Sequence, residues 1–513
     1  MSTTYVTVAI PYVNAEPHLG YAYELVEADI YARARRLAGD DVRLLGGTDD
    51  HALKNVLAAD AEGVPTGAFV DANARRFAAL GGPLDISFDD FLRTSADPRH
   101  RPAVERLWRA CAANGDLYQR TYEGDYCVGC ERFYDNDELI VEPGEVARCP
   151  EHDTTVERVA ETNWFFRLSR YAERLRRSIS AGELAIHPRP FADEILAFID
   201  SGLEDISVSR PANRARGWGI PVPDDPTQVV YVWFDALANY LSALEFGDPD
   251  SDAYKRWCLQ ADRRVHVIGK GILRFHALYW PAFLVSAHQP LPTRVEVHPY
   301  LTVDGAKISK SGPSTVSPFA VVDRWGTDAV RWWFARDVGP VADTDFTEQR
   351  LVERVDQDLA KGIGNVANRI ATLAQRAGVQ AGGRCTPIDG VAGLDEDVLG
   401  ALGDFDLRGA TQAICAAVDA LNRALEATRP WELFHLAAPA NAHLDELLGR
   451  YLASVEVIAA AVRPIVPALA RRLQALLVEG PQLVQPRLAM RVPDCSTRVP
   501  ERATGGAVAL GRA

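Results

Sequence analysis

The sequence has few cysteines and no excess of basic residues, and both shortages exclude classes of protein. Eight cysteines in 513 residues are too few for a disulfide scaffold, and five of them stand alone: Cys111, Cys258, Cys385, Cys415 and Cys495. Lysine and arginine number 55 against 70 aspartates and glutamates, so the net charge of −15 cannot hold nucleic acid by bulk attraction. We therefore expect a reducing compartment and, with any nucleic acid, only local contacts.

Targeting and membrane-spanning segments are also lacking. No basic residue precedes Arg33, which fits neither a signal peptide nor a transit peptide. The longest apolar stretch, around 455–470, is interrupted by Arg463, Pro464 and Pro467 and is more typical of a packed helix than of a membrane span. These features predict a soluble, cytoplasmic protein without a membrane partner.

The order of periodic segments predicts an α/β domain interrupted by an insertion. A buried strand over 5–10 precedes a helix over about 18–37, and a second strand over 42–45 follows. Strand-like runs return later, over 229–234, 265–268 and 295–298. We expect a sheet built from two separated halves, with polar residues at its carboxyl edge.

Changes in composition set the expected domain boundaries, at roughly 150 residues per domain. The two α/β halves cover 1–116 and 209–345, and the insertion covers 117–208. Helical periodicity continues over 346–480 and predicts a bundle, whereas the proline-bearing end over 481–513 predicts a loose tail.

A glycine and a histidine stand where the first strand passes into the first helix. His18 and Gly20 lie at the expected helix N-terminus, where backbone N–H groups and the helix dipole favour an anion such as phosphate. No G-x-x-x-x-G-K pattern is present, so this is not a Walker loop. Taken alone, the pattern is more typical of an ordinary strand-to-helix turn.

A second candidate is the positively charged loop Lys307-Ile308-Ser309-Lys310-Ser311, which glycines flank on both sides. Its two lysines could hold a triphosphate and stabilise charge that develops during nucleotidyl transfer. Without further context, a solvated loop explains it better.

The insertion carries four potential metal ligands in two knuckles, Cys127-x-x-Cys130 and Cys149-x-x-His152. Three thiolates and one imidazole complete a tetrahedral shell and leave no open position. The spacing therefore predicts one structural zinc ion per chain.

A mostly apolar set comes from strand ends and helix starts of both α/β halves: Ile10, Tyr12, Trp233, Tyr240 and His276. Such residues could line a pocket for a hydrophobic side chain. Each one by itself is more typical of core packing.

Together these motifs resemble the methionyl-tRNA synthetase family of class I aminoacyl-tRNA synthetases over nearly the full length. His18-Leu19-Gly20 is similar to the start of the family's HIGH signature, and 307–311 matches its KMSKS loop with Ile308 for Met. The phrases at 231–240 and 266–276 are also typical of the family. The resemblance implies a Rossmann-like catalytic domain with a zinc-binding insertion, followed by an all-α anticodon-binding bundle.

The resemblance also implies roles for particular residues. Catalysis is expected from His18, Lys307 and Lys310, and ATP binding from Tyr12, His18, Gly20, Tyr21, Lys307, Ser309 and Lys310. The methionine site is expected at Ile10, Tyr12, Asp49, Trp233, Tyr240 and His276, with Asp49 holding the ammonium group. Asn365, Arg369 and Trp431 are similar to the family's anticodon readers, because an aromatic ring stacks a splayed base while polar groups read its edges.

The implied reaction needs no protein nucleophile. A methionine carboxylate attacks the α-phosphate of Mg-ATP, and a ribose hydroxyl of tRNA(Met) then takes the acyl group. The enzyme contributes positioning and charge stabilisation. The length leaves no room for a large editing insertion and the dimerisation domain of some relatives looks absent, so we expect a monomer.

Several positions near the catalytic end depart from the family pattern. Tyr21 replaces the second histidine of the signature, and Gly271 follows Gly-Lys where the family has Asp. Asp50 replaces a usual Glu, and Ala52 replaces a Gly, which would be strained if the backbone there needs a positive φ.

These departures leave three hypotheses open. The first is a methionyl-tRNA synthetase with tolerated variation. The second is a paralogue that adenylates an amino acid and transfers it to a non-tRNA acceptor, such as an N-hydroxylated amine in natural-product biosynthesis. The third is a non-catalytic tRNA-binding protein, against which the intact His18, Lys307 and Lys310 argue.

Overall fold

A parallel sheet forms the centre of the chain. The computed structural model describes residues 2–127, 132–134, 138–141, 146–151, 153–303, 305–307, 316–382, 385–434 and 440–480. Within these residues the main sheet has six strands in the order β3-β2-β1-β12-β13-β7, and every neighbouring pair is parallel. The strands are β1 (Thr3–Val8), β2 (Asp41–Thr48), β3 (Asp90–Arg93), β7 (Ala185–His187), β12 (Arg263–Gly269) and β13 (Arg294–His298).

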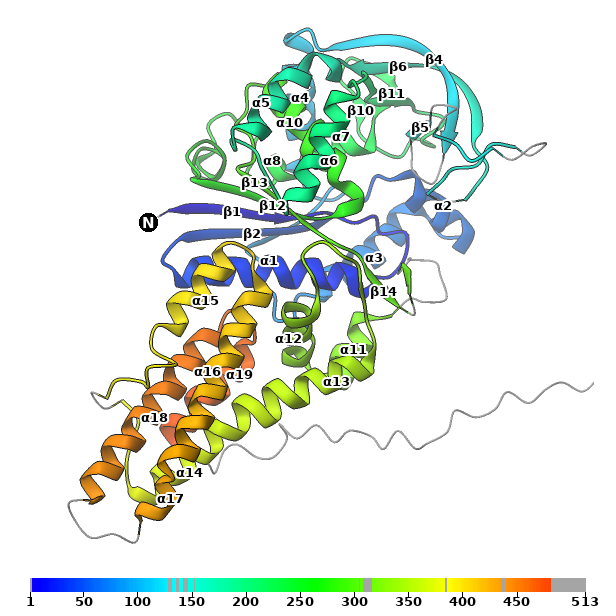
Figure 1. The fold of residues 1–513 in the computed structure, drawn as a ribbon. Helices are drawn as coiled ribbons and strands as arrows, with labels where there is room; N and C mark the ends of the chain where they lie inside the picture. The colour runs from blue at the N-terminus through cyan, green and yellow to red at the C-terminus, as the bar shows by residue number, and fades with distance from the viewer. Residues whose placement is uncertain are drawn as a thin grey trace, which may run out of the picture.

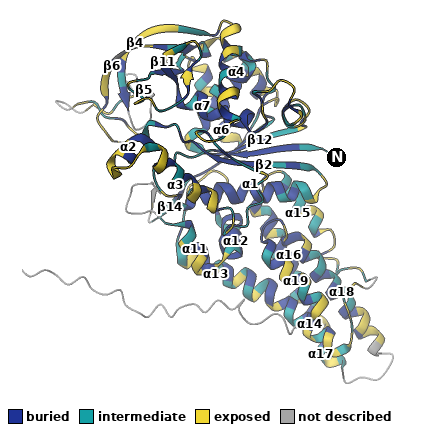
Figure 2. Ribbon diagram, turned by 180° about the vertical axis from the view of Figure 1, so that it is seen from behind, coloured by how far each residue is buried: buried dark blue, intermediate teal, exposed yellow. Residues whose placement is uncertain are grey.

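Helices cover both faces of this sheet, which is why its strands are apolar on both sides. The helices of this region are α1 (Leu19–Leu37), α2 (Leu53–Glu62), α3 (Thr66–Ala79), α4 (His100–Ala113), α7 (Val232–Leu237), α8 (Asn239–Ser242), α9 (Asp252–Tyr254) and α10 (Trp280–Ser286). Val6 and Leu44 pack with α1 on one face, whereas Tyr5 and Leu45 pack with α4, α7, α8 and α10 on the other. Figure 1 shows α1 running along the sheet, and Figure 2 shows it buried over most of its length.

Two strand assignments differ from the sequence expectation. The run 229–234 ends its strand early: β11 (Asp225–Val230) belongs to a separate antiparallel sheet with β9 (Ser209–Pro211) and β10 (Pro221–Val222), and α7 begins at Val232. The main sheet instead gains β7, which pairs with β13 although residues 185–187 were expected in the insertion. A three-residue strand has too little periodicity to be predicted from its sequence.

The described part of the insertion is an antiparallel sheet in the order β5-β4-β6-β8. It consists of β4 (Leu117–Cys127), β5 (Arg132–Tyr134), β6 (Glu157–Phe166) and β8 (Ile206–Ser207), and α5 (Ala172–Ser180) and α6 (Arg189–Asp200) lie between β6 and β8 in the chain. Cys127 ends β4, and the described residue Cys149 lies near it in a small apolar cluster.

Beyond the sheet the chain is helical, as expected. A hairpin of β14 (Leu301–Val303) and β15 (Ala306–Lys307), paired to β16 (Thr344–Asp345), leads into this region. Its helices are α11 (Pro318–Trp325), α12 (Thr327–Asp337), α13 (Glu348–Val355), α14 (Asn365–Ala377), α15 (Leu394–Gly403), α16 (Leu407–Thr428), α17 (Pro430–Leu433), α18 (Ala440–Val462) and α19 (Pro467–Glu479). The expected loose tail, 481–513, lies outside the described residues. None of the helices in the described chain is both long and apolar enough to cross a membrane.

Candidate active site

The N-terminus of α1 opens onto a cavity at the carboxyl edge of the sheet. His18 is the N-cap of α1, and its Nδ1 accepts a hydrogen bond from the Tyr21 backbone N–H at 3.3 Å. A Cβ atom at Gly20 would lie 3.1 Å from the His18 ring, so glycine lets the imidazole pack closely against the first turn. The local geometry expected for an anion-binding helix start is therefore present.

The cavity has a volume of about 280 Å³ and brings together residues that lie far apart in the sequence. Six of the predicted substrate-binding residues line it: Ile10, Tyr12, His18, Gly20, Tyr21 and Trp233. The rest of its wall comes mainly from the end of β12 and the turn that follows, with Gly269, Gly271 and Ile272, and from 298–301, which run from the end of β13 to the start of β14. This is the edge at which open α/β sheets bind ligands.

Tyr240 and His276 are almost fully buried and do not line the described part of this cavity. His276 Nδ1 donates to the Ile272 carbonyl at 3.0 Å, and its Nε2 accepts from the Tyr240 hydroxyl at 2.8 Å. Burial lowers the pKa of His276 to about 4, so the ring is neutral and this tautomer is fixed. Trp233, which does line the cavity, stacks on Phe275 with ring centroids 3.6 Å apart.

Asp49 is held beside Tyr12. The two residues form a parallel β-bridge, and the Asp49 N–H donates to the Pro11 carbonyl at 3.0 Å. Asn55 then fixes the loop, because its amide donates to the carbonyls of Asp49 and Asp50. A buried carboxylate next to the cavity-lining Tyr12 suits an ammonium group.

Sequence reasoning missed two polar residues of the cavity, Glu24 and His298. Glu24 accepts from the backbone N–H groups of Ala9 (2.9 Å) and Gly269 (3.1 Å), and from His298 Nε2 at 3.1 Å. His298 Nδ1 donates to the Pro299 carbonyl, so both ring nitrogens carry protons. Burial lowers the pKa of His298, but hydrogen bonding to Glu24 and the charges of Glu24 and Glu27 raise it above its usual value.

The departures at 50 and 52 are accommodated without strain. Ala52 caps α2 with φ of −61°, so this position needs no glycine. Asp50 is fully buried, but its carboxylate accepts from Ser95 Oγ at 2.6 Å and from Arg93 at 3.2 Å.

Tyr21 is buried against Phe77, with ring centroids 5.4 Å apart. Among the described residues its buried hydroxyl has no hydrogen-bond partner. Burial raises the pKa of this phenol and so keeps it neutral. A phenol in any case carries no positive charge, unlike a protonated histidine.

The signature loop is described only at its start. Lys307 lies in β15 opposite Thr302, so the antiparallel β14–β15 hairpin places its backbone beside the strand that follows the wall residues 298–301. Ser309 and Lys310 lie outside the described residues.

The two predicted zinc knuckles are described in part. Cys127 and Cys149 are both fully buried and share a small apolar cluster with Tyr134 and Val156. Their soft sulfur donors fit a zinc site. Cys130 and His152 lie outside the described residues.

A second group of potential metal ligands consists of His51, His100 and Asp235. Asp235 lies 2.7 Å from His51 Nδ1 and 2.5 Å from His100 Nε2. Two ligands of one zinc ion, each about 2.0–2.1 Å from it at tetrahedral angles, would lie more than 3 Å apart. These three residues therefore form a hydrogen-bonded triad.

The predicted anticodon readers lie together on the helical region. Asn365 begins α14 and is exposed, and Arg369 stands one turn later. The Arg369 guanidinium lies 5.8 Å from the centre of the Trp431 ring and pairs with Glu426 at 2.7 Å. Figure 1 shows α14 and α17 near the end of the helical region that is remote from the sheet.

Comparisons with known proteins agree with this architecture. A family model described as tRNA synthetases class I (M) matches residues 4–371. A methionine–tRNA ligase of Mycobacterium tuberculosis is 37% identical over 490 residues, covering 94% of this chain and 93% of its own. One of Brucella suis is 39% identical over 437 residues, covering 84% of this chain and 83% of its own.

A solved structure extends the likeness to the fold. The M. tuberculosis methionyl-tRNA synthetase in complex with methionyl-adenylate superposes with a TM-score of 0.86 at 37% identity, covering 93% of this chain and 94% of that chain. The match spans the catalytic sheet, the insertion and the helical region. The chain therefore belongs to the class I tRNA synthetases of the methionine type.

Proposed function

We propose that this protein activates methionine with ATP and transfers it to tRNA(Met). The observation that carries the proposal is the single cavity that joins the N-terminus of α1 to Ile10, Tyr12 and Trp233. One cavity with an anion-binding helix start and an aromatic wall suits a phosphate and an apolar amino acid side by side. The relatives named for this reaction support the same reading.

In the first step the methionine carboxylate oxygen attacks the α-phosphorus of Mg-ATP. The bond to the bridging oxygen breaks, and pyrophosphate leaves with its electron pair. Methionyl-adenylate remains. His18 and the α1 N-terminus would stabilise charge on the phosphate oxygens, Asp49 would hold the ammonium group, and Lys307 and Lys310 would act on the leaving pyrophosphate.

In the second step a ribose hydroxyl at the tRNA 3′ end attacks the acyl carbon, and AMP leaves.

The neutral His276 and its partner Tyr240 are uncharged polar groups behind the aromatic wall, which suits a thioether side chain better than a charged one. Asn365, Arg369 and Trp431 would read the anticodon. The Arg369–Trp431 pair supports tRNA as the acceptor over a small molecule.

Zinc binding to Cys127, Cys130, Cys149 and His152 is part of the proposal. The ion would fix the fold of the insertion and would take no part in the reaction. Metal analysis of the purified protein should give about one zinc per chain. A folded protein without zinc would refute this assignment.

We further propose that the enzyme is a cytoplasmic monomer.

The function is tested by methionine-dependent exchange of pyrophosphate into ATP. In His18→Asn the N-cap acceptor is kept but the imidazole is lost, so we expect kcat/KM for exchange to fall by about 10²- to 10³-fold with an unchanged Tm. His288→Asn, on the exposed surface, is the matched control. Absence of methionine-dependent exchange in the wild type would refute the proposal.

A further inference from the structure

The Tyr300 hydroxyl fills the space in the cavity wall that a side chain at residue 271 would occupy. Gly271 lies in the turn after β12, and a Cβ atom built on it would meet the Tyr300 hydroxyl oxygen at 1.9 Å and its Cζ at 3.1 Å. No side chain at 271 can coexist with Tyr300 in this position, because real Cβ contacts are not this short. The departure from Asp at 271 is thus linked to the residue that fills its space.

Tyr300 is fixed in this position by its surroundings. Its backbone N–H donates to Asp343 Oδ1 at 2.9 Å, and its carbonyl accepts from the Thr344 N–H at 3.1 Å. The same Asp343 pairs with Lys270 Nζ at 2.7 Å, and that ammonium lies 4.8 Å from the centre of the Tyr300 ring. Asp343 and Lys270 therefore hold the tyrosine against the glycine turn.

The position of this pair in the cavity indicates which part of the ligands it meets. The α1 N-terminus suits the phosphates, and Ile10, Tyr12 and Trp233 suit the amino acid side chain. The wall that remains for the nucleoside is formed by Gly269, Gly271 and Ile272 together with 298–301. Tyr300 leads directly into β14, so it also joins this wall to the hairpin that carries Lys307.

We propose that Tyr300 is a nucleotide-binding residue that contacts the nucleoside of ATP, and that it can do so only because residue 271 is glycine. The phenol supplies a hydroxyl and a ring edge to this wall, and both suit a nucleoside. This inference rests on the proposed function, because the nucleotide is ATP only if the cavity is an adenylation site.

The test is direct binding of a non-reacting ATP analogue, adenosine 5′-(α,β-methylene)triphosphate, measured by calorimetry on the full chain. Tyr300→Phe removes only the hydroxyl, and we expect the Kd for the analogue to rise by about 3- to 10-fold while the KM for methionine stays unchanged. Gly271→Ala should weaken analogue binding by at least as much, because the new methyl group displaces Tyr300.

The double variant Gly271→Ala with Tyr300→Phe separates coupling from independent damage. Because the colliding oxygen is gone, the double variant should bind the analogue at least as tightly as Gly271→Ala alone. Gly400→Ala, with open space around its Cβ, and Tyr254→Phe, whose hydroxyl donates to Gln289 outside the cavity, are the controls. The Tm of each variant is measured as well, and all binding constants are compared at one temperature at which every variant is folded.

Two results would overturn the inference: an unchanged Kd in Tyr300→Phe, or losses that multiply in the double variant. The proposed function fails separately, because calorimetry needs no reaction. Analogue binding that depends on Tyr300, in a protein without methionine-dependent exchange, would refute the function and keep the nucleotide contact.

Discussion

At the scale of single residues, the hydrogen bond between Tyr240 and His276 shows how burial sets the character of the amino acid site. Burial lowers the pKa of His276 and keeps the ring neutral. Its Nε2 can therefore accept a hydrogen bond from the Tyr240 hydroxyl, 2.8 Å away. Phe275 neighbours this histidine and stacks on Trp233. His276 is therefore linked to the cavity-lining Trp233 through the adjacent residue Phe275.

The first prediction follows from this contact. Tyr240→Phe leaves His276 Nε2 buried without a donor, which costs about 1–3 kcal/mol. We expect the KM for methionine to rise by about 5- to 100-fold while the KM for ATP changes little, as measured by pyrophosphate exchange. Equal changes in both values would contradict the assignment of this pair to the amino acid site.

The sequence predicts some site residues because their signals are local. His18 and Gly20 belong to a short pattern at a helix start, and the structure places both at the cavity. Glu24 and His298 escaped prediction, because their contact joins positions 274 residues apart and arises only when β1, β12 and β13 meet. The clash at Gly271 has no local signal either, since Tyr300 comes from another strand end.

At the scale of elements, the triad of Asp235, His51 and His100 joins three segments. His51 follows β2 and the Asp49 loop, Asp235 belongs to α7 with Trp233, and His100 begins α4. Burial raises the pKa of Asp235, but the two histidines lower it well below its usual value. Burial likewise lowers the pKa of His51, but Asp235 raises it above its usual value. The triad therefore fixes Asp49 and Trp233 relative to each other.

The second prediction concerns the pH dependence of this triad. Since the pKa of His51 is raised in the folded state, its stabilisation is complete below about pH 6.5 and is lost as pH rises through the raised pKa. We expect His51→Asn to lower the Tm by several degrees at pH 6 and by less at pH 9. His288→Asn should change neither value. Thermal unfolding across this range is the measurement, and an equal loss at both pH values would contradict the ion pair.

Element boundaries were less predictable than element order. The expected helix over about 18–37 is observed as Leu19–Leu37, because its periodicity is long. The run 229–234 contains β-favouring residues throughout, yet only its first part is strand. Tyr231 and Val232 pack with Ala52 and Tyr12 in a small cluster, so tertiary contacts decide where α7 begins.

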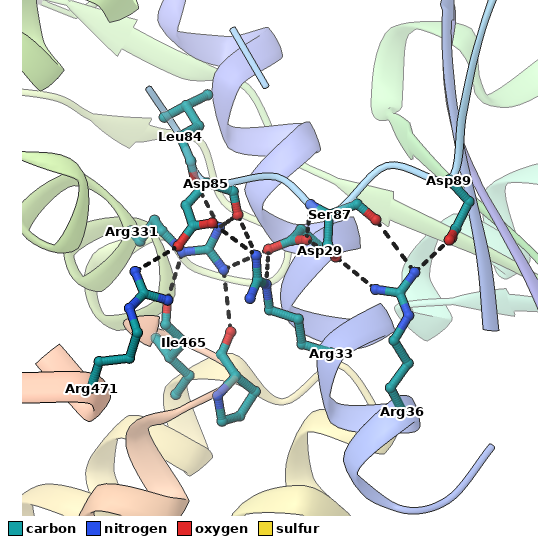
Figure 3. A network of polar contacts seen from close by, with 11 residues as sticks. Asp29, Arg33, Arg36, Leu84, Asp85, Ser87, Asp89, Arg331, Ile465 and Arg471 are labelled. Carbon is teal, nitrogen blue, oxygen red and sulfur yellow. Dashed lines mark hydrogen bonds and ion pairs between the residues drawn. The ribbon is translucent and has the colours of Figure 1, made fainter. Parts of the chain in front are cut away.

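At the scale of the whole molecule, a buried ion pair connects the sheet domain to the helical region. Arg331 of α12 lies 2.7 Å from Asp29 of α1, and both side chains are fully buried. Arg331 also donates to the carbonyls of Leu84 and Ile465, the latter just before α19 (Figure 3). This network fixes how the helical region docks on α1.

The third prediction is that Arg331→Met lowers the free energy of unfolding by about 3–5 kcal/mol. Asp29 loses its fully buried ion-pair partner, although Arg33 and Ser87 still donate to it. The carbonyls of Leu84 and Ile465 also lose the donor that Arg331 supplies. Arg471→Met removes an exposed arginine 3.5 Å from Asp85 in the same region and should cost less than about 1 kcal/mol. Denaturant unfolding checks both. Equal losses in the free energy of unfolding would contradict a larger contribution from the buried Arg331–Asp29 pair than from an exposed one.

The most direct test of the central claim is charging of tRNA(Met) by the purified protein, screened with each standard amino acid and repeated with Trp431→Ala. We expect methionine alone to be attached, and Trp431→Ala to lose at least about tenfold in charging, the cost of one lost base-stacking contact, while pyrophosphate exchange is kept. The claim is that one chain joins an adenylating cavity to an anticodon-reading helical region. It would be contradicted by pyrophosphate exchange without tRNA charging, or by charging that is unchanged in Trp431→Ala.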